Sequence, residues 1–125
     1  MSADLLSDAL TIIRNAESVG KSKCEVSASI LIKNILKVMK AEKYIEDFKP
    51  ANQRKIEVKL IGKINDCRTI KPRLPVKRNE YEKYEKRFLP AKDFGILIVS
   101  TQKGIMSHKK AKENGLGGRL LAFVY

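Results

Sequence analysis

A group of short polar residues directly follows a hydrophobic stretch near the end of the chain. Phe94 to Val99 is a continuous run of apolar, mostly branched side chains, which is typical of a strand buried on both faces. Two hydroxyls, an amide, a cation and a glycine follow it, in the order Ser100, Thr101, Gln102, Lys103 and Gly104. Short donors and acceptors at the exposed end of a strand suit contact with a polar partner. The sequence therefore predicts a binding surface at residues 100–104.

The next residues predict a short helix that could attract an anion. Ser107 has the side chain of a helix N-cap, His108 to Asn114 has helix-forming composition, and Gly115 is a stop signal. The first amides of such a helix favour phosphate, and nearby ammonium groups add to that preference. These groups belong to Lys109, Lys110 and Lys112.

Gly117 and Gly118 fit two interpretations. The stretch Gly115-Leu116-Gly117-Gly118 lacks the GxxxxGK[ST] pattern of a phosphate loop, and it precedes a predicted strand instead of a helix. A tight turn before the last strand explains the glycines. A close approach of nucleic-acid backbone would need the same absence of side chains.

The sequence contains no recognisable set of catalytic residues. His108 is the single histidine, and Cys24 and Cys67 lie far apart without a CxxC motif, so neither a zinc site nor a disulfide scaffold is supported. We interpret the cysteines as two small buried thiols, although a Cys24–Cys67 bridge stays open. The sequence predicts no enzymatic activity, no metal and no cofactor.

The net positive charge of the chain favours a polyanion as its binding partner. The chain has 26 Lys and Arg residues against 14 Asp and Glu residues, a net charge of +12. Residues 1–50 carry +1, residues 51–92 carry +8 and residues 93–125 carry +3. Such a balance favours binding to nucleic acid, although a lysine-rich solubilising surface would look the same. The sequence shows no membrane span and no secretory signal, so we expect a cytoplasmic protein.

The first part of the chain predicts a small module of the order helix, strand, helix, strand, strand. A helix is expected from Asp4 to about Val19, capped by Ser2 or Asp4, and a second one is expected after the cap Ser29. The expected strands are residues 23–28, 44–48 and 55–61, the last two joined as a hairpin. Arg14 and Asn15 lie off the apolar stripe of the first helix, where they could reach a phosphate or a base edge, or simply face solvent.

The second part predicts a mostly antiparallel β module with short helices. Residues 63–74 suggest short strands broken by Asn65-Asp66 and Pro72. Three aromatic residues have helical spacing within Asn79 to Phe88, namely Tyr81, Tyr84 and Phe88. We interpret them as packing residues, with stacking on bases as the alternative. The predicted class is α+β, with two modules at residues 1–62 and 63–125.

Several motifs resemble the S-eight family of small-subunit ribosomal proteins, over essentially the whole chain. The C-terminal signature is Gly95 to His108, with Ala111, Gly115, Gly117-Gly118 and Leu121 to Tyr125. Ile13 to Ala16 is similar to the first-helix motif of that family. Lys71-Pro72-Arg73, Leu89-Pro90-Ala91 and Phe94-Gly95 resemble its archaeal and eukaryotic branch.

The resemblance implies a non-catalytic protein that binds the central domain of small-subunit ribosomal RNA and supports assembly. It places the RNA contacts at Ser100, Thr101, Gln102, Lys103, Gly104, Ser107, His108, Gly117 and Gly118, with Arg14, Asn15, Lys33 and Arg73 as further contacts. Ser29-Ile30 departs from the Ser-Lys of many relatives, and Lys33 could replace the lost cation.

The partners implied are ribosomal RNA, neighbouring small-subunit proteins and the protein's own messenger RNA, with no membrane and a monomeric free state. The alternative functions are a regulator that binds its own messenger RNA or DNA, and an RNA-modifying enzyme. A helix-turn-helix pattern and an acid/base site, which the DNA regulator and the enzyme would need, are not visible.

Overall fold

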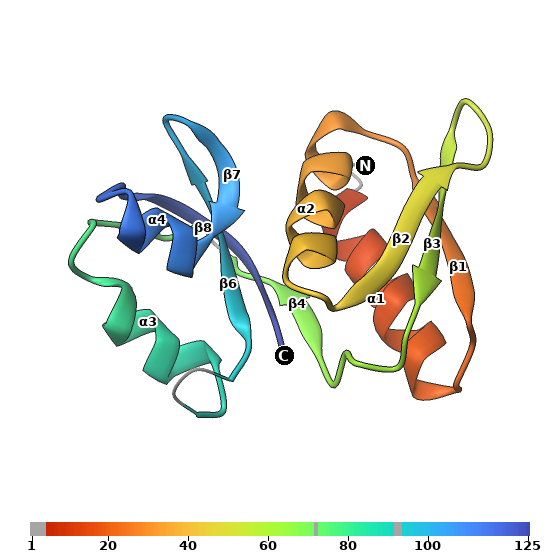
Figure 1. The fold of residues 1–125 in the computed structure, drawn as a ribbon, viewed down its shortest axis with the longest axis horizontal. Helices are drawn as coiled ribbons and strands as arrows, with labels where there is room; N and C mark the ends of the chain where they lie inside the picture. The colour runs from red at the N-terminus through yellow and green to blue at the C-terminus, as the bar shows by residue number, and fades with distance from the viewer. Residues whose placement is uncertain (1–4, 72, 92–93) are drawn as a thin grey trace. The chain divides into compact units, whose positions relative to one another are not determined.

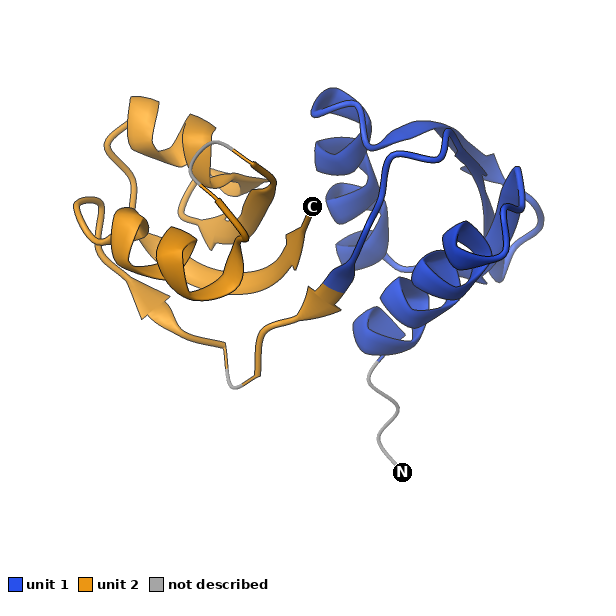
Figure 2. Ribbon diagram, turned by 90° about the horizontal axis from the view of Figure 1, so that it is seen from below, with its two compact units in different colours: residues 1–67 blue, residues 68–125 orange. Residues whose placement is uncertain are grey.

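The computed structural model describes residues 5–71, 73–91 and 94–125, and these form two compact units. Unit 1 comprises residues 1–67 and unit 2 comprises residues 68–125 (Figure 2). The expected boundary after Gly62 thus lies earlier in the chain than the division after Cys67. The predicted α+β class is confirmed, because both units combine helices with antiparallel sheets.

Unit 1 has the predicted order of elements. Its helices are α1 (Leu5–Ser18) and α2 (Ile30–Ala41), and its strands are β1 (Lys23–Ser27), β2 (Ile45–Pro50) and β3 (Lys55–Leu60). The strands form an antiparallel sheet of order β1-β3-β2 (Figure 1). Ser29 caps α2 as predicted, because its hydroxyl accepts the Ile32 N–H at 3.0 Å. The predicted caps Ser2 and Asp4 lie outside the described residues.

One face of the unit 1 sheet is apolar and buried, and the other face carries charged residues. Ile56, Val58 and Leu60 alternate with Lys55, Glu57 and Lys59 along β3, and the apolar set is buried. Helix α1 contacts β1 and α2, and α2 contacts β2. This alternation is what a strand with one packed face requires.

Polar side chains of α1 hold the segment that follows β3. Arg14 Nη1 donates to the Cys67 carbonyl at 3.0 Å and lies 3.9 Å from Asp66 Oδ1. Glu17 Oε2 accepts the Ile64 N–H at 3.2 Å, and the Cys67 thiol donates to the Leu10 carbonyl at 3.3 Å. These bonds explain why unit 1 extends to Cys67.

Replacing Arg14 by Ala is expected to destabilise unit 1 by about 1 to 3 kcal/mol, because a part-buried carbonyl and Asp66 lose a charged partner. Urea unfolding measures the change, and hydrogen exchange should be faster at residues 64–67. The matched variant is Asn15→Ala, whose exposed side chain should leave stability within about 0.5 kcal/mol. Equal stabilities for the two variants would contradict this role of Arg14.

Unit 2 is built around a five-stranded antiparallel sheet. Its path is β4-β8-β6-β7, and β5 pairs with β8 off this path. The strands are β4 (Cys67–Thr69), whose first residue is the last of unit 1, β5 (Pro75–Val76), β6 (Ile96–Thr101), β7 (Gly104–Ser107) and β8 (Gly118–Val124) (Figure 1). The helices are α3 (Tyr81–Phe88) and α4 (His108–Glu113). Pro72, the predicted break between short strands, lies outside the described residues. The mostly antiparallel architecture matches the prediction.

The core of unit 2 lies between the sheet and its two helices. It contains Ile70, Val76, Tyr81, Tyr84, Leu89, Leu97, Val99, Met106, Ala111 and Leu120. The residues from Ile96 to Val99 are all buried, as predicted, but the predicted strand also included Phe94, which is 45% exposed and lies before the start of β6. Tyr81 and Tyr84 are buried as well, and Phe88 packs against the core, which confirms their interpretation as packing residues.

The described residues contain neither a membrane-spanning helix nor a cluster of metal ligands. None of their helices combines the length and the apolar content needed to cross a bilayer. In the same ranges no group of three or more His, Cys, Asp and Glu side chains could hold a metal ion. Both cysteines are free, and burial raises the pKa of Cys24 to about 11 and that of Cys67 to about 12. Both thiols therefore stay protonated at neutral pH.

Candidate nucleic-acid interface

The polar residues after the buried strand form a tight hairpin. Strand β6 pairs with β7 so that Thr101 lies opposite Gly104, and Gln102 and Lys103 make the turn between them. Gln102, Lys103 and Gly104 are exposed. The sequence interpretation of a single short helix between two strands was incomplete, because it missed β7.

The Thr101 side chain stabilises the turn by hydrogen bonding within it. Its hydroxyl donates to the Gly104 carbonyl at 2.8 Å and accepts the Lys103 N–H at 3.1 Å. Gly104 has a φ of 114°, which side chains other than glycine rarely adopt. A Cβ at Gly104 would meet nothing within 4 Å, so its backbone is open to a partner. The turn is therefore fixed by its own hydrogen bonds and presents Gln102, Lys103 and Gly104 outward.

Replacing Thr101 by Val is expected to cost about 1 kcal/mol, because the side chain keeps its shape and loses both turn bonds. The amide of Lys103 should then exchange faster with solvent, as measured by NMR hydrogen exchange. Thr101→Ser keeps the hydroxyl and should behave as the wild type. Unchanged exchange at Lys103 in Thr101→Val would show that the hydroxyl does not hold the turn.

Ser100 and Arg119 form a cross-strand pair beside this turn. Ser100 lies opposite Ile105 on β7 and opposite Arg119 on β8. Residues that oppose each other in an antiparallel pair project from the same face of the sheet. The preceding row, Val99 with Met106 and Leu120, belongs to the core, so Ser100 and Arg119 project from the opposite face.

Both groups of this pair are available to a partner. The Ser100 hydroxyl is half-buried, the Arg119 side chain is exposed, and neither has a hydrogen bond or ion pair with another residue in the described part of the chain. The sequence interpretation missed Arg119. The signal for it was present, because Arg119 is the one charged residue in the apolar run from Gly118 to Val124.

Neighbouring backbone of the same chain leaves no room for a side chain at Gly117 or Gly118. A Cβ on Gly117 would lie 2.6 Å from the Val76 carbonyl oxygen, and one on Gly118 would collide with the Ser100 carbonyl oxygen. Neighbouring backbone therefore occupies the space that a side chain would need. Close packing against the backbone of Val76 and Ser100 explains both glycines, so neither the predicted tight turn nor a nucleic-acid contact is needed to explain them.

Ser107 and His108 are buried, so we leave their side chains out of the interface. Ser107 Oγ accepts the Lys110 N–H at 3.2 Å and caps α4, as predicted. His108 is 1% exposed, and its Nδ1 accepts the Leu97 N–H at 2.9 Å. Its Nε2 lies 3.3 Å from Glu85 Oε1. The family resemblance placed His108 among the RNA contacts, but its ring is buried and joins α4 to β6 and α3.

Lys112 is also engaged within unit 2. Its Nζ lies 2.6 Å from Glu85 Oε2, although the Lys112 side chain is exposed, as are those of Lys109 and Lys110. Burial lowers the pKa of His108, and the nearby Glu85 carboxylate offsets part of this effect. Burial raises the pKa of Glu85, but the bonds and charges of Lys112 and His108 outweigh it and leave the pKa lowered. At neutral pH the imidazole of His108 is therefore neutral, and the Glu85 carboxylate beside it is paired with Lys112.

The other predicted contacts are spread over both units. In unit 1, Arg14 is tied to residues 66–67, while the side chains of Asn15 and Lys33 are exposed on α1 and α2. In unit 2, Arg73 is exposed one residue before Leu74, whose carbonyl accepts the Leu120 N–H at 2.8 Å. Arg73 therefore belongs to the segment that runs beside β8 and Arg119.

The charge of the chain is concentrated in unit 2. This unit has fourteen Lys and Arg residues against five Asp and Glu residues, a net charge of +9, whereas unit 1 carries +3. The side chains of Ser100, Gln102, Lys103 and Arg119 place hydroxyl, amide, ammonium and guanidinium groups on this unit, and such groups suit contact with a folded polyanion.

Comparison with known sequences decides the family. The sequence model of the family described as Ribosomal protein S8 matches residues 4–125. The chain belongs to this family. One similar protein, named small ribosomal subunit protein uS8, comes from Archaeoglobus fulgidus and is 57% identical over 129 residues, which cover all of both chains. A second with the same name, from Methanococcoides burtonii, is 53% identical over 126 residues, which cover 98% of this chain and 97% of its own length.

Membership in the Ribosomal protein S8 family confirms the resemblance inferred from the sequence motifs. The match spans both units, so the family assignment applies to the whole arrangement of α1 to β8. The two relatives come from archaea, in agreement with the branch suggested by residues 71–73 and 89–91.

Proposed function

We propose that this S8-family chain is a structural component of the small ribosomal subunit, where it binds the central domain of small-subunit ribosomal RNA and supports assembly. The contact surface, which we name the hairpin surface, consists of Ser100, Gln102, Lys103, Gly104 and Arg119. The observation that carries the proposal is the Ser100–Arg119 pair beside the exposed turn, whose side chains have no hydrogen bond or ion pair with any residue that the structure describes. We further propose a cytoplasmic, ribosome-bound protein that is monomeric when free.

The chemistry of the hairpin surface favours RNA with an irregular or A-form shape. A-form RNA displays its 2′-hydroxyls and base edges in a wide, shallow minor groove, and displaced bases are available at irregular sites. The Ser100 hydroxyl and Gln102 amide can both donate and accept hydrogen bonds. Arg119 and Lys103 supply cations for phosphate. A short rigid hairpin can bring these groups to such a surface together.

Equilibrium binding to a small-subunit ribosomal RNA transcript tests the proposal. Ser100→Ala and Arg119→Gln are each expected to weaken binding by about 1 to 3 kcal/mol, because each removes a hydrogen-bonding group from the contact. Arg119→Gln should also lower the salt dependence by roughly one unit of slope per lost phosphate contact. Binding to random RNA of equal length should change little with Ser100→Ala.

Matched variants control for charge and for side-chain loss. Arg54→Gln removes the same charge from an exposed turn of unit 1, and Ser22→Ala removes an exposed hydroxyl there. Both should bind the transcript as the wild type does. Equal losses on random RNA, or equal losses for Arg54→Gln and Arg119→Gln, would contradict specific contact at the hairpin surface.

The alternative is a regulator that binds its own messenger RNA or DNA. A messenger that folds into a similar shape would present the same minor-groove groups to the hairpin surface. Adding the messenger leader and a duplex DNA of equal length to the same titration distinguishes these cases. Tighter binding to DNA than to either RNA would favour a DNA regulator.

A further inference from the structure

The hydroxyl of Tyr81 bonds the connection between α4 and β8. Tyr81 is the first residue of α3, it is 1% exposed, and its ring lies in the core of unit 2. Its hydroxyl donates to the Leu116 carbonyl at 2.8 Å. Burial raises the pKa of Tyr81, so the hydroxyl keeps its proton at neutral pH. This bond therefore joins α3 to the residues that lead into β8.

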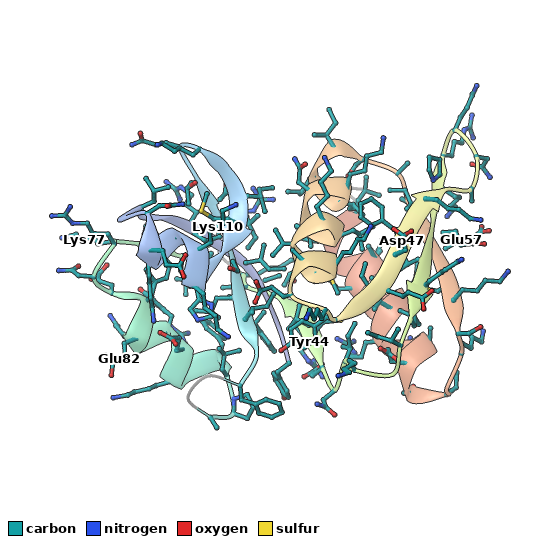
Figure 3. All side chains as sticks on the ribbon, viewed as in Figure 1. Tyr44, Asp47, Glu57, Lys77, Glu82 and Lys110 are labelled. Carbon is teal, nitrogen blue, oxygen red and sulfur yellow. The ribbon has the colours of Figure 1, made fainter. Side chains whose placement is uncertain are left out.

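The turn before Tyr81 fixes the point from which this bond is made. Residues 77–80 connect β5 to α3, and the side chain of Lys77 projects outward from this turn (Figure 3). The Lys77 N–H donates to Glu80 Oε1 at 2.9 Å, and the Glu80 N–H donates to the Lys77 carbonyl at 2.9 Å. Because these two bonds close the turn, Tyr81 is held at a set position after β5.

The backbone between Leu116 and Arg119 consists of two glycines. Glycine has access to more backbone conformations than any other residue, so Gly117 and Gly118 give this segment wide freedom in the absence of other restraints. Neighbouring backbone excludes a side chain at both positions, so no other residue could stiffen them. Strand β5, which pairs with Gly118 and Arg119, is only two residues long. A fixed point just before the glycines therefore restricts the segment directly.

A bulge at Leu121 interrupts the pairing of β8 with β6 on the other side of Arg119. A bulge breaks the ladder of hydrogen bonds locally. The pairing of the last residues of β8 therefore does not by itself fix the position of its first residues. Two anchors flank Arg119 within this first part of β8, namely the buried side chain of Leu120 and the bond from Tyr81 to Leu116.

We infer that Tyr81 is a positioning residue for RNA binding, and that its bond to the Leu116 carbonyl keeps Arg119 aligned with Ser100 on the hairpin surface. The inference rests on the proposed function. Tyr81 lies in the core and does not itself touch RNA. Without its hydroxyl, residues 116–118 become a looser strand end, and the Arg119 guanidinium spends less time beside the Ser100 hydroxyl. The affinity for RNA then falls through Arg119, although the Arg119 side chain is intact.

A double-mutant cycle with the full chain and a small-subunit ribosomal RNA transcript tests this inference. Tyr81→Phe removes the hydroxyl and keeps the ring, and it should weaken binding about fivefold, which is the scale of one hydrogen bond. In the Arg119→Gln background the same change should weaken binding less than about twofold, because the group that Tyr81 positions is already absent. Tyr81→Phe should also lower the salt dependence of binding toward that of Arg119→Gln, since fewer phosphate contacts persist.

Two further variants separate the bond from other effects of the substitution. Tyr84→Phe removes a hydroxyl from the next turn of α3, where the residue is buried and its hydroxyl has no hydrogen bond with a described residue, and it should bind as the wild type does. Replacement of Tyr81 by p-aminophenylalanine keeps a donor at the end of the ring and should bind within about twofold of wild type.

Three results of these titrations would overturn the inference. They are unchanged binding of Tyr81→Phe, an equal loss for Tyr84→Phe, and an equal loss when Tyr81→Phe is made in the Arg119→Gln background. The last result would make Tyr81 a purely structural residue, because its effect would then not act through Arg119.

Hydrogen exchange in the free protein provides a second measurement, which does not depend on RNA. In Tyr81→Phe the amides of residues 116–119 should exchange at least about threefold faster than in wild type, because a local restraint is lost. Tyr84→Phe should leave these rates unchanged. Equal rates in Tyr81→Phe and wild type would show that the hydroxyl does not hold the start of β8, and would overturn the inference.

Failure of this inference is distinguishable from failure of the proposed function. If the wild-type protein ignores the ribosomal transcript, the proposed function fails whatever Tyr81 holds. If transcript binding depends on Ser100 and Arg119 while Tyr81→Phe binds as wild type, the positioning role of Tyr81 alone is rejected.

Discussion

Replacing Gly118 by Ala is expected to destabilise unit 2 by about 3 kcal/mol, at the upper end of what overpacking costs. The added methyl group would collide with the carbonyl of Ser100 on the neighbouring strand, and it would come within 3.1 Å of Val99 Cγ2. Backbone cannot move aside as a flexible side chain can, so β6 and β8 would have to separate locally. Urea unfolding followed by circular dichroism measures the loss.

Gly115→Ala is the matched control for this prediction. Gly115 has a φ of 66°, but a Cβ there would meet nothing within 4 Å. Only the backbone conformation then opposes the substitution, which should cost about 1 kcal/mol. If Gly118→Ala proved no more harmful than Gly115→Ala, the close approach of β8 to β6 would be wrong. The Gly118 variant should also lose RNA affinity, because the same contact aligns Ser100 with Arg119.

Replacing His108 by Ala is expected to cost about 3 kcal/mol or more, because the change leaves a cavity and unpaired polar groups. The Leu97 N–H would lose its acceptor inside the core, and the Glu85 carboxylate, whose side chain is 13% exposed, would lose one of its two partners. Lys109→Ala, on the next residue, is the exposed control and should stay within about 0.5 kcal/mol of wild type.

The same network should make unit 2 sensitive to acid. Burial lowers the pKa of His108 below its ordinary value of 6.5, and its Nδ1 already accepts a backbone hydrogen bond, so the folded state binds a proton less readily than the unfolded chain. The lowered pKa of Glu85 acts in the same direction. Stability should therefore be full above about pH 6.5 and should fall as the pH drops through the lowered folded values.

The free energy of unfolding, measured from about pH 7.5 down to about pH 4, tests this dependence, because this range includes the ordinary histidine pKa. His108→Gln should show a shallower decline than wild type, because one of the two linked groups is removed. If the free energy of unfolding fell equally steeply with decreasing pH in both proteins, His108 would not contribute to the loss of stability in acid.

Local signals in the sequence were sufficient for most of the fold. The Ser29 cap, the apolar side of α2 and the buried run from Ile96 to Val99 each follow from neighbouring residues, and each appears where expected. Strand β7 was missed because Gly104–Ser107 is short and its turn, Gln102-Lys103, lacks the Asn-Gly or Asp-Gly pattern of common hairpins. That strand depends on pairing with β6, which no local pattern reveals.

The candidate site was less predictable, because side-chain direction depends on tertiary pairing. Ser100 and Thr101 are adjacent and chemically similar, yet the Thr101 hydroxyl bonds its own turn while the Ser100 hydroxyl has no hydrogen bond to a described residue. The family resemblance placed His108 among the RNA contacts, although its spacing of three residues from the buried Ala111 indicates an inward face. A glycine that faces backbone cannot be told by sequence from one that faces a ligand.

A footprint of the wild-type protein on full-length small-subunit ribosomal RNA tests the central claim most directly. Hydroxyl-radical cleavage of the RNA backbone, with and without protein, reports protection at each nucleotide. We expect one compact protected region with the wild-type protein. The Ser100→Ala, Arg119→Gln double variant should lose this protection, and the matched Ser22→Ala, Arg54→Gln double variant should keep it. Scattered protection, or the same protected region with the double variant, would contradict the claim that the hairpin surface binds ribosomal RNA.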